Sequence, residues 1–254
     1  MSLSKTTQAA GFDFLAAVQF LTRIPTPNVP YDANSLSRAV KFFPVVGLLI
    51  GGTAALLHGL LAPHLSRLAA ALAVVLFLAV ITGLLHEDGL ADVADGFGGG
   101  SNRERILLIL KDSRIGSYGG AALVFSLLAR VVLLASIPLA QVAHYLIAAH
   151  VLSRWTTLPL SYALASARAQ EGQGARIARL TTRTSLVMGT LFTLAICIWV
   201  LRTHTLAPVL AAFLITLISG IYFKRKIGGV TGDCFGATNQ LTEIAVYLTG
   251  AWIV

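Results

Sequence analysis

Charged residues are scarce in this chain of 254 residues: Asp, Glu, Lys and Arg make up only 12% of it. A typical soluble domain has about 25%. Hydrophobic residues make up 56%, the mean hydropathy is +0.78, and several long runs have no charge at all. This composition excludes an ordinary soluble domain and predicts an all-α protein that crosses a membrane several times.

Cysteine is almost absent as well. Cys197 falls in an apolar run and Cys234 in a polar segment, so we expect them at different depths and unpaired. We therefore expect neither a disulfide framework nor a metal–thiolate site. Residues 14–21 are apolar, but Asp13 precedes them and no small-residue cleavage site follows, so we expect no cleavable signal peptide. Without repeats or low-complexity linkers, residues 1–254 are most simply one domain.

The apolar runs predict a polytopic helical bundle with about seven transmembrane helices. A bilayer core needs about 20 mostly apolar residues per helix. The expected spans are residues 43–61, 68–86, 116–137, 142–164, 185–201, 207–223 and 241–254. Residues 12–22 predict a short membrane-associated helix before them, and Pro25, Pro27 and Pro30 predict an extended segment after it.

The basic residues sort the loops into two sides. Fifteen of the 19 Lys and Arg fall on one side, in residues 1–42, 87–115, 165–184 and 224–240. Only Arg67 and Arg202 fall on the other side, so the positive-inside rule makes the first side cytoplasmic. We therefore expect a bacterial cytoplasmic (inner) membrane protein. Its net charge of +8 is a topology signal, and the scatter of basic residues over loops argues against nucleic-acid binding.

The main chemical motif is acidic. Four of the eleven acidic residues lie in the nine positions from Glu87 to Asp95. Asp88, Asp92 and Asp95 have the spacing i, i+4, i+7, which places them on one face of a helix. No Lys or Arg follows until Arg103, so a cation is the missing partner. Hard oxygen ligands suit Mg²⁺ or Mn²⁺, and we predict an Mg²⁺ site here; a solvated helix end is the simpler alternative.

A second polar motif opens the third expected span. Lys111 and Arg114 flank Asp112 and Ser113 at its start, with Gly116 close behind. The two cations could bind phosphate oxygens, and Asp112 could serve as metal ligand or general base. The alternative is a basic anchor of the kind that the positive-inside rule describes.

A third motif precedes the last span. Asp233 is the only acidic residue of the glycine-rich segment 224–240, where it is either a site residue or a turn stabiliser. Asn239 and Glu243 follow it as substrate contacts or as residues that start the helix. All three motifs fall on the expected cytoplasmic side.

Several glycines and two arginines have two interpretations each. Gly89 and Gly96 break the helix or let a phosphate approach the backbone, and residues 98–100 are a flexible turn or a phosphate cradle. The G-x-x-x-G pattern of residues 47–51 favours helix packing. Arg130 and Arg154 fall inside spans and are functional candidates by default. Arg130 could snorkel to the far side, which makes Arg154 the better candidate.

The motifs together resemble a known family. Residues 86–96 (HEDGLADVADG) and 111–116 (KDSRIG) resemble the signature of the cobalamin synthases, the adenosylcobinamide-GDP ribazoletransferases. Residues 20–25 and 42–47 are similar to the family's N-terminal pattern, and residues 228–237 to its C-terminal one. Arg130 stands where Lys is expected, and Cys234-Phe235 where an aliphatic pair is more typical.

The resemblance implies the last assembly step of the cobalamin nucleotide loop. α-Ribazole, or its 5′-phosphate, would attack adenosylcobinamide-GDP through its 3′-hydroxyl and release GMP. The enzyme would use Mg²⁺ as cofactor and lie in the lipid bilayer. The resemblance leaves open whether the protein forms a homo-oligomer. The expected site has catalytic residues (Asp112, Asp233, Lys111, Arg114), metal ligands (Glu87, Asp88, Asp92, Asp95) and substrate-binding residues (Gly89, Gly96, Ser113, Gly116, Arg154, Asn239, Glu243).

Two other classes fit less well. A CDP-alcohol phosphatidyltransferase also has an Asp-Gly-rich motif at a helix end, but this chain lacks the Ala-Arg that follows that family's first Asp-Gly. A cation transporter with Asp ligands should hold them on broken helices at the bilayer midplane. We expect the acids of this chain at a helix end in an aqueous loop, which favours the enzyme.

Overall fold

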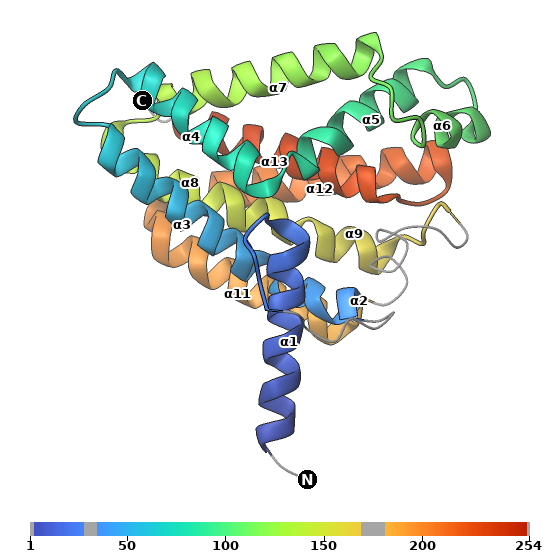
Figure 1. Ribbon diagram of the computed structural model, residues 1–254, viewed down its shortest axis with the longest axis horizontal. Coiled ribbons are helices and arrows are strands. Elements are labelled where there is room, and N and C mark those ends of the chain that lie inside the picture. The colour runs from blue at the N-terminus through green and yellow to red at the C-terminus, as the bar shows by residue number, and fades with distance from the viewer. Residues whose placement is uncertain (1–2, 28–34, 169–180, 253–254) are drawn as a thin grey trace.

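The computed structural model describes residues 3–27, 35–168 and 181–252, and in them the regular elements are helices (Figure 1). In chain order they are α1 (Leu3–Leu21), α2 (Ser35–Ala39), the short 3₁₀ helix η1 (Val40–Phe42), α3 (Phe43–Leu61), α4 (Arg67–Thr82), α5 (Leu85–Gly99), α6 (Arg103–Ile109), α7 (Ser117–Ser136), α8 (Leu139–Trp155), α9 (Thr157–Ala163), α11 (Arg183–Leu201), the 3₁₀ helix η2 (Arg202–His204), α12 (Leu206–Ile227) and α13 (Gly232–Trp252). The predicted all-α class is confirmed for the described residues.

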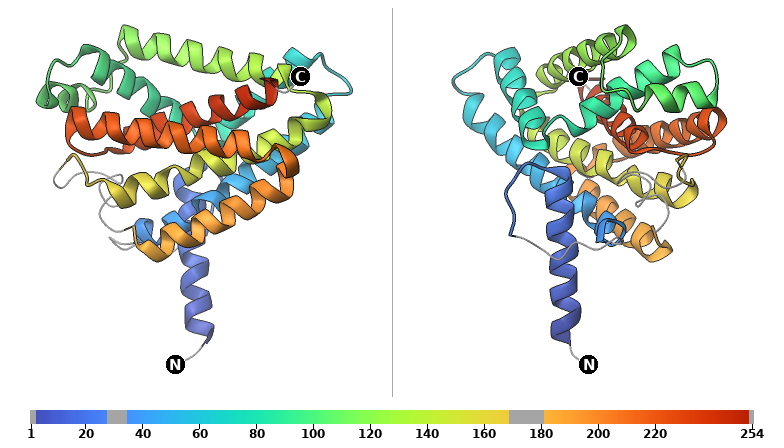
Figure 2. Two further views of the ribbon diagram at one scale, coloured as in Figure 1. Left: turned by 180° about the vertical axis from the view of Figure 1, so that it is seen from behind. Right: turned by 45° about the vertical axis from the view of Figure 1, so that its right-hand side comes forward.

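The long helices form one bundle with α13 inside it. α13 packs against α5, α7, α8 and α12, while α3 lies along α8. α1 projects away from the bundle in all three views (Figures 1 and 2). It is joined to the bundle through the buried Asp13, whose carboxylate accepts bonds from Arg38 at 3.0 Å and Lys41 at 3.1 Å.

The helices identify a multi-pass membrane protein. Four of the described helical stretches are long and apolar enough to cross a bilayer, namely Ser35–Leu61, Ser117–Ser136, Arg183–His204 and Leu206–Ile227. A fifth is added if the bent pair α4 and α5 counts as one span. Large apolar side chains on the outer surface, such as Phe125, Trp199 and Leu206, are 72%, 72% and 77% exposed, as lipid-facing residues would be.

The predicted count of seven spans is not confirmed. The expected span 142–164 divides into α8 and α9, and α8 has only 17 residues. The expected span 241–254 belongs to a longer helix, α13, whose first half carries Asp233, Asn239 and Gln240. Hydropathy marked the apolar parts correctly but could not show where a helix divides or how far it extends into a polar motif.

The expected span 68–86 is two helices that meet at an angle of 89°. α4 ends at Thr82 because Gly83 takes a left-handed conformation (φ 63°), and its N–H donates to carbonyls of the last turn of α4. Leu84 also has positive φ (61°), which is uncommon for a residue with a side chain. The backbone N–H of Arg23 donates to the Ile81 carbonyl at 2.7 Å, so the segment after α1 binds the end of α4. α5 therefore starts at a sharp break.

The G-x-x-x-G pattern packs α3 against α8, as predicted. A Cβ atom on Gly47 would overlap the carbonyl oxygen of His150, and one on Gly51 would lie 2.8 Å from the Cα of Ile147. The backbones of the two helices are therefore in direct contact. This contact sets the position of the C-terminal half of α8, which carries His150 and Arg154.

Replacing Gly47 with Ala is expected to lower the free energy of unfolding by about 1–3 kcal/mol, because the new methyl group meets backbone that cannot move aside. Gly52 on the same helix is the matched control, since a Cβ there would have no neighbour within 4 Å. Thermal unfolding of both variants in detergent measures the difference. Equal midpoints for Gly47→Ala and Gly52→Ala would contradict the tight α3–α8 contact.

Candidate active site

The acidic motif lies on α5, as its spacing predicted, and α5 packs closely against α13. A Cβ atom on Gly89 would lie 2.9 Å from the carbonyl oxygen of Asp233 and 3.1 Å from the Cα of Gly236. The small residues allow the two backbones to touch, and this contact brings Asp233 to the aspartates of α5. Gly89 is thus buried in a helix contact, and its proposed approach to a phosphate stays a prediction.

A cavity of about 180 Å³ opens at this contact. Two predicted acids, Asp88 and Asp233, line it together with Gly89. His86, which adjoins the acidic motif in the sequence, also lines it. The other lining residues were given no role in the site from the sequence and are mostly apolar or aromatic: Phe20, Leu21, Phe43, Leu85, Thr157, Gly232, Phe235 and Gly236. The site thus combines carboxylates from two helices with hydrophobic walls from α1 and α3.

Asp92 has the other predicted aspartates of the site as its charged neighbours. It is half-buried and within electrostatic reach of Asp88, Asp95 and Asp233, with Arg168 as the cation among them. Asp233 accepts a hydrogen bond from the Thr231 hydroxyl at 3.1 Å. Since these are like charges, the arrangement favours a bound cation.

Asp95 has a different environment from its neighbours. Its two oxygens accept the backbone N–H groups of Gly116 at 2.7 Å and Gly119 at 2.8 Å, at the start of α7. A carboxylate is favourable at a helix N-terminus because the first N–H groups have no partner inside the helix. The predicted metal ligand Asp95 and the predicted substrate residue Gly116 are therefore joined to each other. Gly96 packs against Leu110: a Cβ atom on Gly96 would lie 3.0 Å from the Leu110 side chain.

Asp112 and Arg114 form an exposed ion pair, with Nη2 and Oδ2 2.6 Å apart. Hydrogen bonds from Arg114 lower the pKa of the Asp112 carboxyl to about 2. Both residues line an open hollow of about 440 Å³ together with Asp95 and Gly116, and Lys111 and Ser113 are exposed nearby. The structure therefore groups Asp112 with Asp95 and not with Asp233. The turn expected at residues 98–100 starts later, because α5 continues to Gly99.

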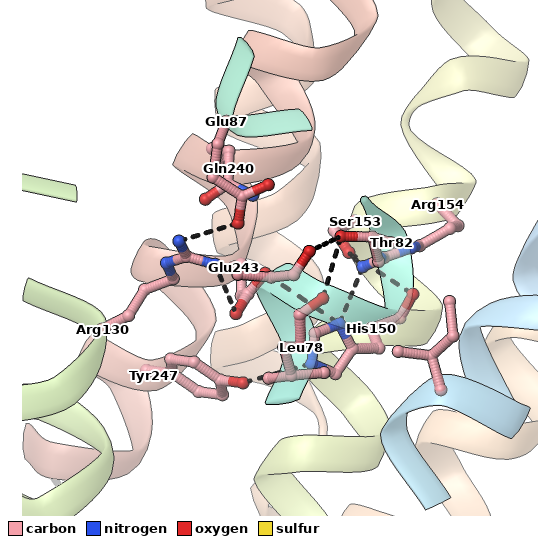
Figure 3. Close-up of polar contacts among 12 residues, drawn as sticks. Leu78, Thr82, Glu87, Arg130, His150, Ser153, Arg154, Gln240, Glu243 and Tyr247 are labelled. Carbon is pink, nitrogen blue, oxygen red and sulfur yellow. Dashed lines mark hydrogen bonds and ion pairs between the residues drawn. The ribbon is translucent and has the colours of Figure 1, made fainter. Parts of the chain in front are cut away.

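Glu87, the fourth predicted metal ligand, takes part in a buried ion pair inside the bundle (Figure 3). Its Oε1 accepts a hydrogen bond from Nη2 of Arg130 at 2.9 Å, and both side chains are at most 3% exposed. A buried guanidinium needs a carboxylate partner, which explains why Glu87 points away from the aspartates. Arg130 lies inside the bundle and does not snorkel to its far side.

The same network contains two of the predicted substrate residues. Nη1 of Arg130 lies 3.6 Å from Glu243, which lies 3.9 Å from Nδ1 of His150. Nη1 of Arg154 lies 2.7 Å from the same nitrogen. Figure 3 also shows Tyr247, whose hydroxyl lies 3.4 Å from His150. Arg154 lies on the same helix as His150, but Glu243 and Tyr247 come from α13, and sequence spacing does not reveal that contact.

Asn239, predicted as a substrate residue, is also buried on α13, at 2% exposure. Its Oδ1 has no hydrogen-bond partner among the described residues. It lies between the site end of α13 and the ion-pair network in sequence, and its role stays a prediction.

Comparison with known proteins identifies the family. The family model of cobalamin-5-phosphate synthase matches residues 13–251. The chain belongs to the cobalamin-5-phosphate synthase family. A relative from Sinorhizobium medicae (strain WSM419) is 41% identical over 92% of this chain and 94% of its own length. One from Vibrio cholerae (strain ATCC 39541) is 35% identical over 92% and 91%. Both are named adenosylcobinamide-GDP ribazoletransferase, and no solved structure matches the chain.

Whether this cobalamin-5-phosphate synthase homologue can hold Mg²⁺ depends on its oxygen donors. In the described part of the chain, no three His, Cys, Asp or Glu side chains are arranged as a complete metal site. Mg²⁺ usually takes only one or two carboxylates, with water and substrate phosphates as the remaining ligands. Asp88 and Asp233 line the cavity, and Asp92 lies within electrostatic reach of both, so these three supply donors of that kind. The residues therefore fit Mg²⁺ in this mode.

Proposed function

We propose that the protein is an adenosylcobinamide-GDP ribazoletransferase, which joins the cobinamide phosphate of adenosylcobinamide-GDP to α-ribazole, or to its 5′-phosphate, and releases GMP. The observation that carries this proposal is the meeting of Asp88 and Asp233 at one cavity, because the two carboxylates come from two of the motifs by which the sequence resembles the family. The substrates in this proposal are taken from the name that the relatives carry, adenosylcobinamide-GDP ribazoletransferase.

The reaction exchanges one phosphorus–oxygen bond for another. The ribazole 3′-hydroxyl oxygen bonds to the cobinamide-side phosphorus, the anhydride bond to GMP breaks, and its electron pair leaves with GMP. The hydroxyl proton goes to a carboxylate. Asp233 is a better base than Asp112, because a carboxyl whose pKa is about 2 accepts a proton poorly at neutral pH.

The acidic residues of α5 divide into two pairs under this proposal. Glu87 pairs with Arg130 and Asp95 caps α7, so these two fix the ends of the acidic segment. Asp88 and Asp92, between them, would hold Mg²⁺, and Asp233 would face them as the base. Bound Mg²⁺ would supply positive charge against the phosphates. Mg²⁺ binding by Asp95, which the spacing predicted, and by Glu87, which the family resemblance implied, would require both to leave their present partners.

The cations at the start of α7 have a supporting role in the proposal. Lys111 and Arg114 are exposed beside the hollow that contains Asp95 and Gly116, where they would bind phosphate oxygens of the GDP group of the substrate with Ser113. Deeper in the bundle, Arg154 and Glu243 belong to the buried network, and contact with the substrate there stays a prediction.

We further propose that the site faces the cytoplasm from the bacterial inner membrane, on the side that the basic residues favour. In a background without Cys197 and Cys234, single cysteines at the exposed positions Ser101 and Lys226 should react with an impermeant thiol reagent only from the cytoplasmic side. A cysteine at Ser66 should react only from the other side. Labelling of Ser101 and Lys226 from opposite faces would rule out a shared site.

Purified protein in detergent tests the function directly. With adenosylcobinamide-GDP, α-ribazole and Mg²⁺, we expect equal amounts of GMP and adenosylcobalamin, separated by chromatography. Replacing adenosylcobinamide-GDP with a CDP-alcohol lipid tests the rival phosphatidyltransferase, which would release CMP. CMP release without GMP release would contradict the proposal, and a transporter would release neither.

A further inference from the structure

The side chain of Arg168 lies beside the carboxylates of the site. Its Nη2 is 3.6 Å from Oδ2 of Asp233, and its charge acts on both Asp233 and Asp92. The side chain is 21% exposed. In the sequence, Arg168 is one of several scattered basic residues, and nothing around it resembles a motif.

Arg168 has hydrogen-bonding capacity that the described residues do not use. Its Nε and Nη2 are buried and have no hydrogen-bond partner among them, and the contact with Asp233 is too long for a hydrogen bond. A buried N–H without an acceptor is unfavourable. The guanidinium fork has the geometry to bind two oxygens of one phosphate. An anionic ligand at this position would satisfy both donors.

The backbone around Arg168 is held in place against the start of α13. Ala167 N–H donates to the Val230 carbonyl at 2.9 Å, and Val230 N–H donates to the Ala165 carbonyl at 3.0 Å. Arg103 adds a second anchor, because its Nη2 donates to the Ala167 carbonyl at 3.0 Å. The position of Arg168 relative to Asp233 is thus set by three chain segments that are distant in sequence.

A simple ion pair with Asp233 explains these contacts less well. In that case the guanidinium and the carboxylate would be expected within hydrogen-bonding distance, as Arg114 and Asp112 are at 2.6 Å. Asp233 Oδ2 instead accepts its bond from Thr231, 3.1 Å away, which leaves the donors of Arg168 unsatisfied.

We propose that Arg168 binds the diphosphate of the substrate and stabilises the negative charge that GMP gains as it leaves. The assignment rests on the proposed transferase function, and it adds a residue that contacts the substrate. When the anhydride bond breaks, its electron pair goes to an oxygen of the GMP phosphate. Arg168 donates hydrogen bonds to that phosphate and exchanges no proton, because its guanidinium stays charged throughout.

Kinetics separate this role from a structural one. Arg168→Gln should lower kcat/KM for adenosylcobinamide-GDP about 100-fold, as the loss of a donor to developing charge does, and leave the KM for α-ribazole unchanged. Arg168→Lys should retain part of the activity, because it keeps the charge but loses the fork. Arg105→Gln, an exposed position on α6, is the matched control and should behave as wild type.

A binding measurement makes the result independent of turnover. Inorganic pyrophosphate, titrated calorimetrically in metal-free buffer, should bind Arg168→Gln about 10-fold more weakly than wild type or Arg105→Gln. Unchanged pyrophosphate affinity of Arg168→Gln would overturn the role of Arg168. So would an equal fall in kcat/KM for both substrates together with a lower unfolding midpoint. If wild type released no GMP, the proposed function would fail, and the pyrophosphate titration would still decide whether Arg168 binds a diphosphate.

Discussion

Replacing Asp92 with Asn is expected to abolish GMP release and leave the protein folded in the membrane. Asp92 is the half-buried acid between Asp88, Asp95 and Asp233. Removing its charge relieves repulsion without metal but takes away a proposed ligand when Mg²⁺ is present. We expect a rate loss of at least about 100-fold, the size found when a group that stabilises transition-state charge is lost. Initial rates at limiting Mg²⁺ give the measurement.

Glu104→Gln is the matched control for this variant. Glu104 is 77% exposed on α6, also in the segment between α4 and α7, and it lies outside both pockets described above. It should keep the wild-type rate and Mg²⁺ dependence. The unfolding midpoint of Asp92→Asn without metal should equal or exceed that of wild type. A wild-type rate for Asp92→Asn at limiting Mg²⁺ would show that Asp92 is not a metal ligand.

Replacing Arg130 with Met is expected to cause the largest loss of stability, about 3–5 kcal/mol, because it leaves two buried carboxylates without their cation. Those carboxylates belong to Glu87, 2.9 Å from Arg130, and Glu243, 3.6 Å from it. Thermal or denaturant unfolding in detergent measures the change in the free energy of unfolding.

The partner variant Glu87→Gln distinguishes an unpaired charge from lost packing. Met fills a similar space to the Arg stem, so packing alone predicts a small effect for Arg130→Met. If the charge is responsible, adding Glu87→Gln should recover part of the stability that Arg130→Met loses. Arg130→Lys keeps the charge and should lose less stability than Arg130→Met, alone or combined with Glu87→Gln. Additive losses in the double variant would contradict a coupled ion pair.

The periodic features of the sequence predicted their structures well. The i, i+4, i+7 acids lie on a helix, and Gly47 and Gly51 form a helix contact. Both depend only on helix geometry, which is local. The placement of Asp88 and Asp92 on one helix was therefore predictable from spacing alone, and their part in metal binding stays a prediction.

The partners of each acid were not predictable, because they depend on how α5 is oriented. Glu87 and Asp88 are adjacent in sequence but lie about 100° apart around a helix, so one faces Arg130 and the other the cavity. The orientation of α5 follows from the positive φ angles of Gly83 and Leu84, which hydropathy does not reveal. Arg168 was missed for a similar reason: its place depends on backbone bonds to residue 230, far away in the chain.

The break between α4 and α5 also bears on the competition between ribazole and water. The 16 residues of α4 are about 24 Å long, which is shorter than the bilayer core of about 30 Å. A helix that turns there brings Asp88 to the edge of the hydrocarbon layer, at the cavity that Phe20, Phe43 and Phe235 also line. For the proposed reaction, these apolar walls would favour attack on the anhydride by the ribazole hydroxyl over attack by water, so that the activated corrinoid is joined to its base and not hydrolysed.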